Sequence, residues 1–169
     1  MVRQEICKAA TLVLTAACLL LFLVPIPIQS VSMVPGVTML GRLAYPFFHV
    51  NIFHALVNLW ILLCIVFYYD MPLWKLMVGY AIAVTYPVDF IASLGMNMAM
   101  LPTVGLSGVV YALMALQSFR VKRRWYWQKW MLFYLVLGFL LPGVNGIIHL
   151  YCYMVGLVVA LFDMPIKRK

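Results

Sequence analysis

Residues 52–69 read IFHALVNLWILLCIVFYY, 18 residues without an aspartate, glutamate, lysine or arginine. Such a run is typical of a helix that crosses a bilayer, because about 20 apolar residues span the hydrocarbon core. The rest of the 169-residue chain has the same character: it is 67% hydrophobic and only 9% charged, with a mean hydropathy of +1.06. The sequence therefore predicts a membrane protein.

This composition excludes several classes of protein. Soluble domains are about 45–50% apolar and about 25% charged, and one of this size could not bury such an excess of apolar side chains. A soluble enzyme, a secreted disulfide-stabilised domain and a disordered chain are therefore excluded. The four cysteines lie in or beside apolar runs and lack metal-ligand spacing, so we interpret them as small buried hydrophobic residues.

Charged residues, prolines and glycines divide the chain into six apolar runs. We predict an all-α membrane protein, a polytopic bundle of six transmembrane helices forming one domain over residues 1–169. The expected spans cover about residues 8–28, 52–69, 75–95, 105–119, 127–142 and 147–163. The first run could be a cleaved signal peptide, but no small-residue cleavage site follows it, and we keep it as a span.

The basic residues indicate the orientation of these spans. Eleven of the twelve would lie on one side of the membrane, and only Arg42 on the other. By the positive-inside rule, both termini are then cytoplasmic. The net charge of +8 is accordingly interpreted as a topology signal and not as a nucleic-acid site. The eleven are Arg3, Lys8, Lys75, Arg120, Lys122, Arg123, Arg124, Lys129, Lys167, Arg168 and Lys169.

Two further segments bear on the membrane interface. Residues 30–51 hold prolines and glycines that prevent a long helix, yet they are too apolar for a solvated loop. We expect an outer segment half-embedded in the interface, where Arg42 is either a headgroup anchor or a hydrogen-bond hub. The aromatic residues of 125–130, beside the basic loop, fit an interfacial belt on the inner side. The absence of organelle-targeting features favours a bacterial plasma membrane.

Polar groups gather at the outer ends of the second, fourth and sixth spans. His49 and His54 lie at the start of the second span, and His149 lies at the start of the sixth. The fourth opens with Gly105-Leu106-Ser107-Gly108. Ionisable groups inside a membrane are costly and are usually functional.

Small residues suggest how two of these ends meet. Gly108-x-x-x-Ala112 and Cys152-x-x-x-Gly156-x-x-x-Ala160 form stripes that let helices approach closely in lipid. If the stripes face each other, Ser107 lies beside His149 at the same depth. A serine next to a histidine is a nucleophile with its base.

The second span could supply a third element. His54 and Asn58 are four residues apart and share one helix face, from which both could donate to an oxyanion. Each element also has a simpler interpretation: Ser107 as a packing residue, His54 and Asn58 as interhelical hydrogen-bond partners, and His149 as part of a proton path. Their joint occurrence at one end of alternate spans favours the catalytic interpretation.

These stretches resemble the rhomboid intramembrane serine proteases. The matching segments are HVNIFHALVNLW (49–60), GLSGVVYALMAL (105–116) and HLYCYMVGLVVAL (149–161). The resemblance covers about residues 8–164, and the chain is similar to the minimal six-helix form of the family. It implies that substrates are transmembrane proteins, that the fifth span is the lateral gate, and that no metal or organic cofactor is needed.

The resemblance also implies roles for individual residues. Ser107 would match the nucleophile and His149 the general base, with Tyr111 stacked on the base. The main-chain N–H of Ser107 and the side chains of His54 and Asn58 would match the oxyanion hole. Five further motif positions, chiefly structural, are His49, Arg42, Gly105, Gly108 and Gly156.

Three positions depart from the family pattern. Gly41 stands where a tryptophan usually precedes the arginine, Cys152 replaces the first glycine after the base histidine, and Ile148 replaces a small residue. None of these removes a proposed catalytic group. Cys152 nevertheless bears on how closely the fourth and sixth spans can approach.

Other functions remain open at this stage. One is a catalytically silent rhomboid-like protein that binds transmembrane segments; another is a small transporter or channel with a histidine proton path. Asp89, near Pro87 in the third expected span, could orient His149 as a third catalytic member, or bond to backbone groups or to another helix.

Overall fold

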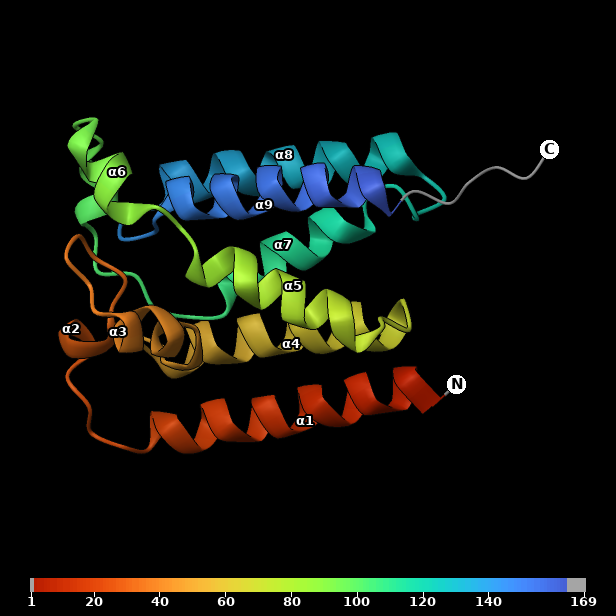
Figure 1. Ribbon diagram of the computed structural model, residues 1–169, viewed down its shortest axis with the longest axis horizontal. Helices are drawn as coiled ribbons and strands as arrows, with labels where there is room; N and C mark the ends of the chain where they lie inside the picture. The colour runs from red at the N-terminus through yellow and green to blue at the C-terminus, as the bar shows by residue number, and fades with distance from the viewer. Residues whose placement is uncertain (1, 164–169) are drawn as a thin grey trace.

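The computed structural model describes residues 2–163, which fold into helices joined by short loops (Figure 1). The basic residues Lys167, Arg168 and Lys169, expected to be cytoplasmic, lie outside these residues. Within the described part the chain has no strand, only an isolated bridge between Met33 and Thr103, and the predicted all-helical class is confirmed. The elements are α1 Val2–Phe22, α2 Ile28–Val31, α3 Met39–Ala44, η1 Tyr45–Phe47, α4 Ile52–Tyr68, α5 Leu73–Val84, α6 Val88–Ser93, η2 Asn97–Met100, α7 Ser107–Gln117, α8 Arg124–Leu140 and α9 Gly146–Phe162.

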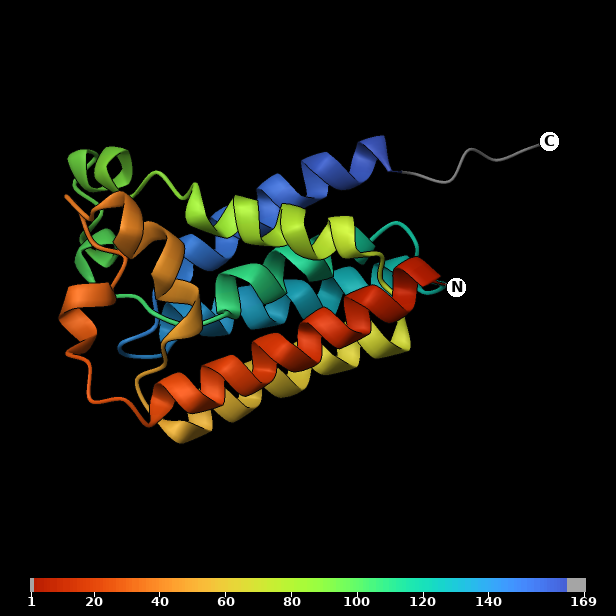
Figure 2. The ribbon, with the colours of Figure 1, turned by 60° about the horizontal axis from the view of Figure 1, so that its bottom comes forward.

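The six longest helices run side by side in alternating directions (Figures 1 and 2). Helix α7 lies among them and packs against α4, α5 and α9, while α8 packs against α9 and α1 against α4 and α5. The short helices α2, α3 and α6 gather at one end of the bundle, opposite the start of α1. The starts of α4, α7 and α9 therefore share the end that carries these short helices.

Helix length supports fewer spans than the six expected. Gln4–Phe22 and the stretch Leu73–Ser93 are long and apolar enough to cross a membrane, and the pair Met39–Phe47 and Ile52–Tyr68 adds a third if its 84° bend is counted as one broken span. Helix α7 has 11 residues and is therefore about 16 Å long, about half of a hydrocarbon core. By this measure the six-span bundle is not confirmed.

Two helix boundaries differ from the sequence expectation. Helix α1 ends at Phe22 and does not continue to residue 28, because Pro25 and Pro27 lack an N–H and clash with a preceding turn. The third expected span, 75–95, is interrupted between Val84 and Val88, where Pro87 begins the separate helix α6. Proline thus accounts for both differences.

Arg42 is a hydrogen-bond hub in the segment 30–51. Its guanidinium donates to the Tyr86 carbonyl at 2.8 Å and to the Asp89 carboxylate at 2.6 Å. The other carboxylate oxygen of Asp89 accepts from the Gly36 main-chain N–H at 2.6 Å. The segment is therefore fastened to the break between α5 and α6. Since both oxygens of Asp89 are engaged here, the carboxylate does not orient His149.

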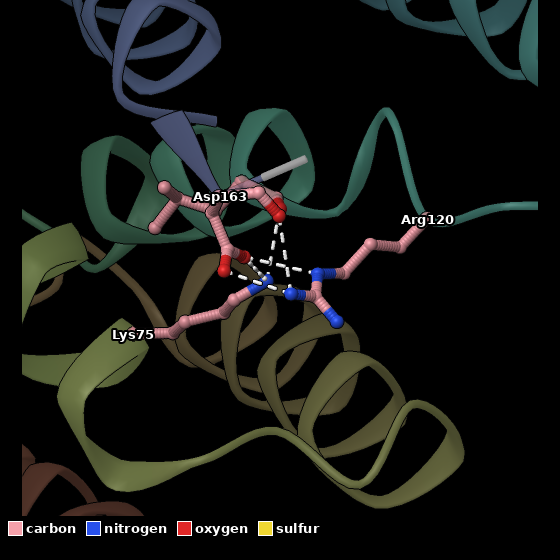
Figure 3. Close-up of polar contacts among 4 residues, drawn as sticks. Lys75, Arg120 and Asp163 are labelled. Carbon is pink, nitrogen blue, oxygen red and sulfur yellow. Dashed lines mark hydrogen bonds and ion pairs between the residues drawn. The ribbon is translucent and has the colours of Figure 1, made fainter. Parts of the chain in front are cut away.

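At the opposite end of the bundle, an ion cluster joins α5 to the turns that follow α7 and α9 (Figure 3). Arg120 binds Asp163 through two nitrogens, at 2.7 and 2.9 Å, and Lys75 lies 2.8 Å from the same carboxylate. The Lys75 ammonium also donates to the Leu116 carbonyl at 3.1 Å. Lys75 is the first residue of the expected span 75–95 and is counted there with the cytoplasmic cations; in the structure it lies in the first turn of α5, with only 2% of its side chain exposed. Partial burial raises the pKa of Asp163, but hydrogen bonds from Arg120 and Lys75 lower it more, so it lies below its ordinary value.

Replacing Asp163 by asparagine is expected to destabilise the fold by about 2 kcal/mol, because the buried Lys75 loses its counter-ion. This is below the about 3–5 kcal/mol of a fully buried pair, since Asp163 is partly exposed. Lys75→Met removes the buried charge itself and is expected to cost less. Thermal unfolding in detergent measures both, and an equal loss in the two variants would contradict the prediction. In the parent protein, the ionised Asp163 stabilises the fold at pH values above its ordinary pKa. This contribution is lost as the pH falls through the lowered pKa of the folded state.

Candidate active site

Ser107 and His149 meet at the starts of two neighbouring helices. Ser107 is the first residue of α7, and its Oγ lies 2.9 Å from Nε2 of His149 in the first turn of α9. Asn145 caps α9 by accepting from the Ile148 main-chain N–H at 3.4 Å, and its own amide donates to Thr103 at 2.9 Å. The cap ties the start of α9 to the segment that leads into α7.

Small residues allow this approach. A Cβ added at Gly156 would lie 2.7 Å from the Ala115 Cβ and 2.9 Å from the Ala112 carbonyl oxygen, so only glycine fits here without a shift. One turn earlier in α9, Cys152 is fully buried, and its Sγ lies 3.2 Å from where a Cβ of Gly108 would stand. Gly108 thus makes room for the sulfur. The departure at Cys152 leaves the 2.9 Å contact between the serine and the histidine intact.

The imidazole of His149 is held between α7 and α8. The Tyr111 ring stacks on it, with centroids 4.4 Å apart and an interplanar angle of 18°, and the Tyr111 hydroxyl donates to the Tyr134 carbonyl at 3.3 Å. Gly138 of α8 faces the other ring nitrogen, since a Cβ there would stand 3.3 Å from Nδ1. This Nδ1 is buried and has no hydrogen-bond partner among the described residues. The serine–histidine pair therefore has no third member among the described residues.

His54 and Asn58 lie against the segment that leads into Ser107. Gly105 has φ +114°, a region that favours glycine, and a Cβ there would stand 2.8 Å from His54 and 3.3 Å from the Asn58 Nδ2. The amide of Asn58 is buried, 5% of the residue being exposed, and its Nδ2 has no partner among the described residues. A buried donor without an acceptor is costly. This one lies beside Gly105, two residues before Ser107, and Asn58 and Ser107 line the same cavity.

His49 supports this segment from the side. The Leu106 main-chain N–H donates to its Nε2 at 3.5 Å, and its ring packs edge-to-face on His54 with centroids 5.2 Å apart. Burial, with a smaller contribution from His54, lowers the pKa of His49 to about 4. The imidazole is therefore neutral near pH 7, which leaves Nε2 free to accept.

Two cavities meet at the serine. A cavity of about 580 Å³ lies between α4, α7 and α8 and is lined mainly by apolar side chains. A second, of about 560 Å³, lies at the end of the bundle between residues 50–57, 102–107 and 142–149. His54, Ser107 and His149 line both. The Ser107 hydroxyl can thus be approached along an apolar route between helices and from the end of the bundle.

Sequence reasoning missed two residues of this site. Gly138, which faces His149, is an isolated glycine in an apolar run. Such a glycine often indicates close packing against a neighbour. Asn145 directly precedes Gly146, and an asparagine before an apolar periodic segment is an N-cap signal. Both signals are visible in the printed sequence, although neither indicates which side chain will lie opposite.

Fold and site together define a class of protein: an apolar helical bundle with a serine–histidine pair recessed among its helices. A family model, the Rhomboid domain, matches residues 37–166, which is most of the chain, and the chain therefore belongs to the rhomboid family. Members of this family are generally serine intramembrane proteases, and with its apolar helices the chain is an integral membrane protein. No curated protein matches the chain.

Proposed function

We propose that this protein is an intramembrane serine endopeptidase that cleaves transmembrane segments of membrane proteins near the outer face. The observation that carries the proposal is the 2.9 Å contact between Ser107 Oγ and His149 Nε2. The stacked Tyr111 keeps the imidazole in this orientation. A hydroxyl with a histidine base at hydrogen-bond distance is the arrangement that covalent acyl transfer requires.

The reaction follows from this geometry. His149 Nε2 accepts the Ser107 proton as Oγ attacks the scissile carbonyl carbon, and the carbonyl oxygen becomes an oxyanion. The main-chain N–H of Ser107, free because it lies in the first turn of α7, stabilises this charge together with His54 and Asn58. His149 then returns the proton to the leaving amine. Water attacks the acyl-enzyme with the same histidine as base and releases the second product.

The topology proposed is six spans in one domain, with both termini in the cytoplasm. Support comes from the alternating directions of the six longest helices (Figure 1). The basic segment between α7 and α8 lies at the end of the bundle opposite the start of α7, which supports an inside location for that end. Other helices enclose the short α7. Ser107, its first residue, lines the cavity at the end of the bundle, through which water would reach it. A bacterial plasma membrane is the proposed location.

The substrate would enter sideways between α4 and α8. The cavity there is apolar and reaches the serine, as a segment that leaves lipid requires. A transmembrane helix keeps its amides hydrogen-bonded, so the segment must unwind before a carbonyl can reach Ser107. Small or helix-breaking residues near the cleaved bond should favour cleavage.

Covalent labelling tests this function against its alternatives. The purified protein is treated with a fluorophosphonate, which reacts with activated serines, and the modified peptide is identified by mass spectrometry. Label on Ser107 supports the protease, whereas its absence, with binding of transmembrane peptides retained, would favour a catalytically silent member of the family. Ion flux through the protein in liposomes would instead favour a transporter.

Gly156→Ala is expected to lower kcat/KM for a transmembrane reporter peptide by about 100-fold. The added methyl would overlap Ala112 and Ala115 and push α9 away from α7, and a displacement of about 1 Å between reacting groups costs about this much. Val158→Ala, on the exposed face of α9, is the control and should change turnover little. Full activity of Gly156→Ala would show that the close helix contact does not set the dyad.

A further inference from the structure

Four cations in one short segment have no acidic partner within the described part of the chain. The four carboxylate side chains of the protein are all engaged elsewhere: Glu5 and Asp70 with Lys8, Asp89 with Arg42, and Asp163 with Lys75 and Arg120. The remaining cations whose side chains are described all lie in 122–129 and are exposed: Lys122, Arg123, Arg124 and Lys129. The positive charge of this segment is therefore uncompensated.

Exposed aromatic side chains continue this charged surface along α8. Trp125 is 83% exposed, and Tyr126 and Trp130 are also exposed and pack edge-to-face. Trp130 contacts Phe133 in turn, at 5.6 Å between centroids. Tryptophan and tyrosine rings at such a position suit the boundary between headgroups and acyl chains. The basic side chains thus lie at the end of the bundle, and the aromatic side chains follow them along α8 toward the apolar side of the bundle.

The opposite face of the same turns is already occupied within the protein. Gln128 accepts from the Tyr153 hydroxyl of α9 at 2.6 Å, and Trp127 packs edge-to-face on Tyr69 with centroids 5.9 Å apart. The start of α8 is therefore anchored on one face and open on the other. Its basic and aromatic side chains belong to the open face.

We propose that residues 122–130 form a binding surface for the phosphate headgroups of anionic phospholipids. Lys122, Arg123 and Arg124 would contact the phosphates, and Trp125 and Trp130 would lie beside the glycerol and the first methylenes. Each cation near an anionic membrane surface contributes to such binding. The proposal concerns a lipid surface and does not depend on the activity proposed above.

A lipid fits this surface better than an acidic peptide does. The aromatic side chains lie on the apolar side of the cations, where a membrane supplies a matching apolar phase and a soluble peptide does not. The cytoplasmic flanks of transmembrane proteins are themselves enriched in lysine and arginine, which these cations repel.

The test uses the full protein in nanodiscs of phosphatidylcholine with a minor share of phosphatidylglycerol. Brominated phosphatidylglycerol is expected to quench tryptophan fluorescence more strongly than brominated phosphatidylcholine at equal content. In the variant Lys122→Gln/Arg123→Gln/Arg124→Gln the preference for the anionic lipid should fall by about 100-fold. The control, Lys122→Arg/Arg123→Lys/Arg124→Lys, keeps the charge and should keep the preference. Salt should weaken it, because exposed charges are screened.

Three results would overturn the proposal. One is an unchanged lipid preference in the triple glutamine variant while its thermal unfolding matches that of the parent. Another is loss of the preference in the charge-preserving variant. The third is displacement of the anionic lipid by a soluble poly-glutamate peptide at comparable concentration, which would assign the surface to acidic protein segments. The phosphate assignment would be supported if the charge-preserving variant retained the lipid preference and the triple glutamine variant lost it.

Discussion

Ser107→Ala is expected to lower hydrolysis of a transmembrane reporter peptide by about 10⁴- to 10⁶-fold, to the background rate. In the proposed reaction the alanine removes the attacking atom, and among the described residues no second hydroxyl has a hydrogen bond to His149. The fold should be retained, because within residues 2–163 the Ser107 side chain makes no hydrogen bond besides the one to His149. Turnover in detergent and thermal unfolding are measured on the same preparation.

The double variant Ser107→Ala/His149→Ala sharpens this test. Residues that act as a unit have non-additive effects, so the double variant should be no slower than Ser107→Ala alone. Ser118→Ala is a matched control, since this buried serine of the same helix region bonds to Met114 and Tyr153, far from the dyad. Residual turnover above about 10% in Ser107→Ala would assign the reaction to another nucleophile.

The closeness of Ser107 and His149 could be predicted because it follows from local patterns. Span ends are visible in charge and hydropathy, and alternation of direction places every second span start on one side. The stripes around Gly108 and Gly156 then indicate which helices approach closely. In the structure both residues lie where α7 and α9 contact.

Contacts between distant residues could not be predicted in the same way. Lys75 and Asp163 are 88 positions apart, and nothing near Lys75 in the sequence indicates that its side chain is buried with Asp163 as its partner. The partnership of Arg42 with Asp89 is similarly nonlocal, so sequence reasoning left the role of the carboxylate open. Such ion pairs depend on which helix ends meet, and one sequence holds no local signal for that choice.

Helix α7 is shorter than the span expected for it. Sequence reasoning assigned a span to 105–119, yet the helix begins only at Ser107 and ends at Gln117. A short helix is tolerated because other helices surround it and its unpaired ends need not face lipid. Hydropathy cannot distinguish an enclosed short helix from a full span, but this shortness is what recesses the serine below the end of the bundle.

Asn58→Ala is expected to lower kcat by about 10²–10³-fold with little change in KM. Its Nδ2 is a buried donor without an acceptor, beside the Gly105 main chain that leads into Ser107. An oxyanion formed at Ser107 would supply that acceptor in the transition state only, and loss of one oxyanion donor has an effect of this size. Because Nδ2 has no hydrogen-bond partner among the described residues, its removal should not lower the unfolding temperature.

Two companion variants separate this role from packing. Asn58→Asp has nearly the same shape but replaces the donor by an acceptor or a negative charge, so it should be at least as slow as Asn58→Ala. Asn97→Ala, in η2 and away from both cavities that the serine lines, is the matched control and should retain parental turnover. A loss in Asn58→Ala confined to KM would make the residue a substrate-binding group. A loss that tracks the unfolding temperature would make it a packing residue, and the oxyanion would then depend on His54 and the Ser107 main chain alone.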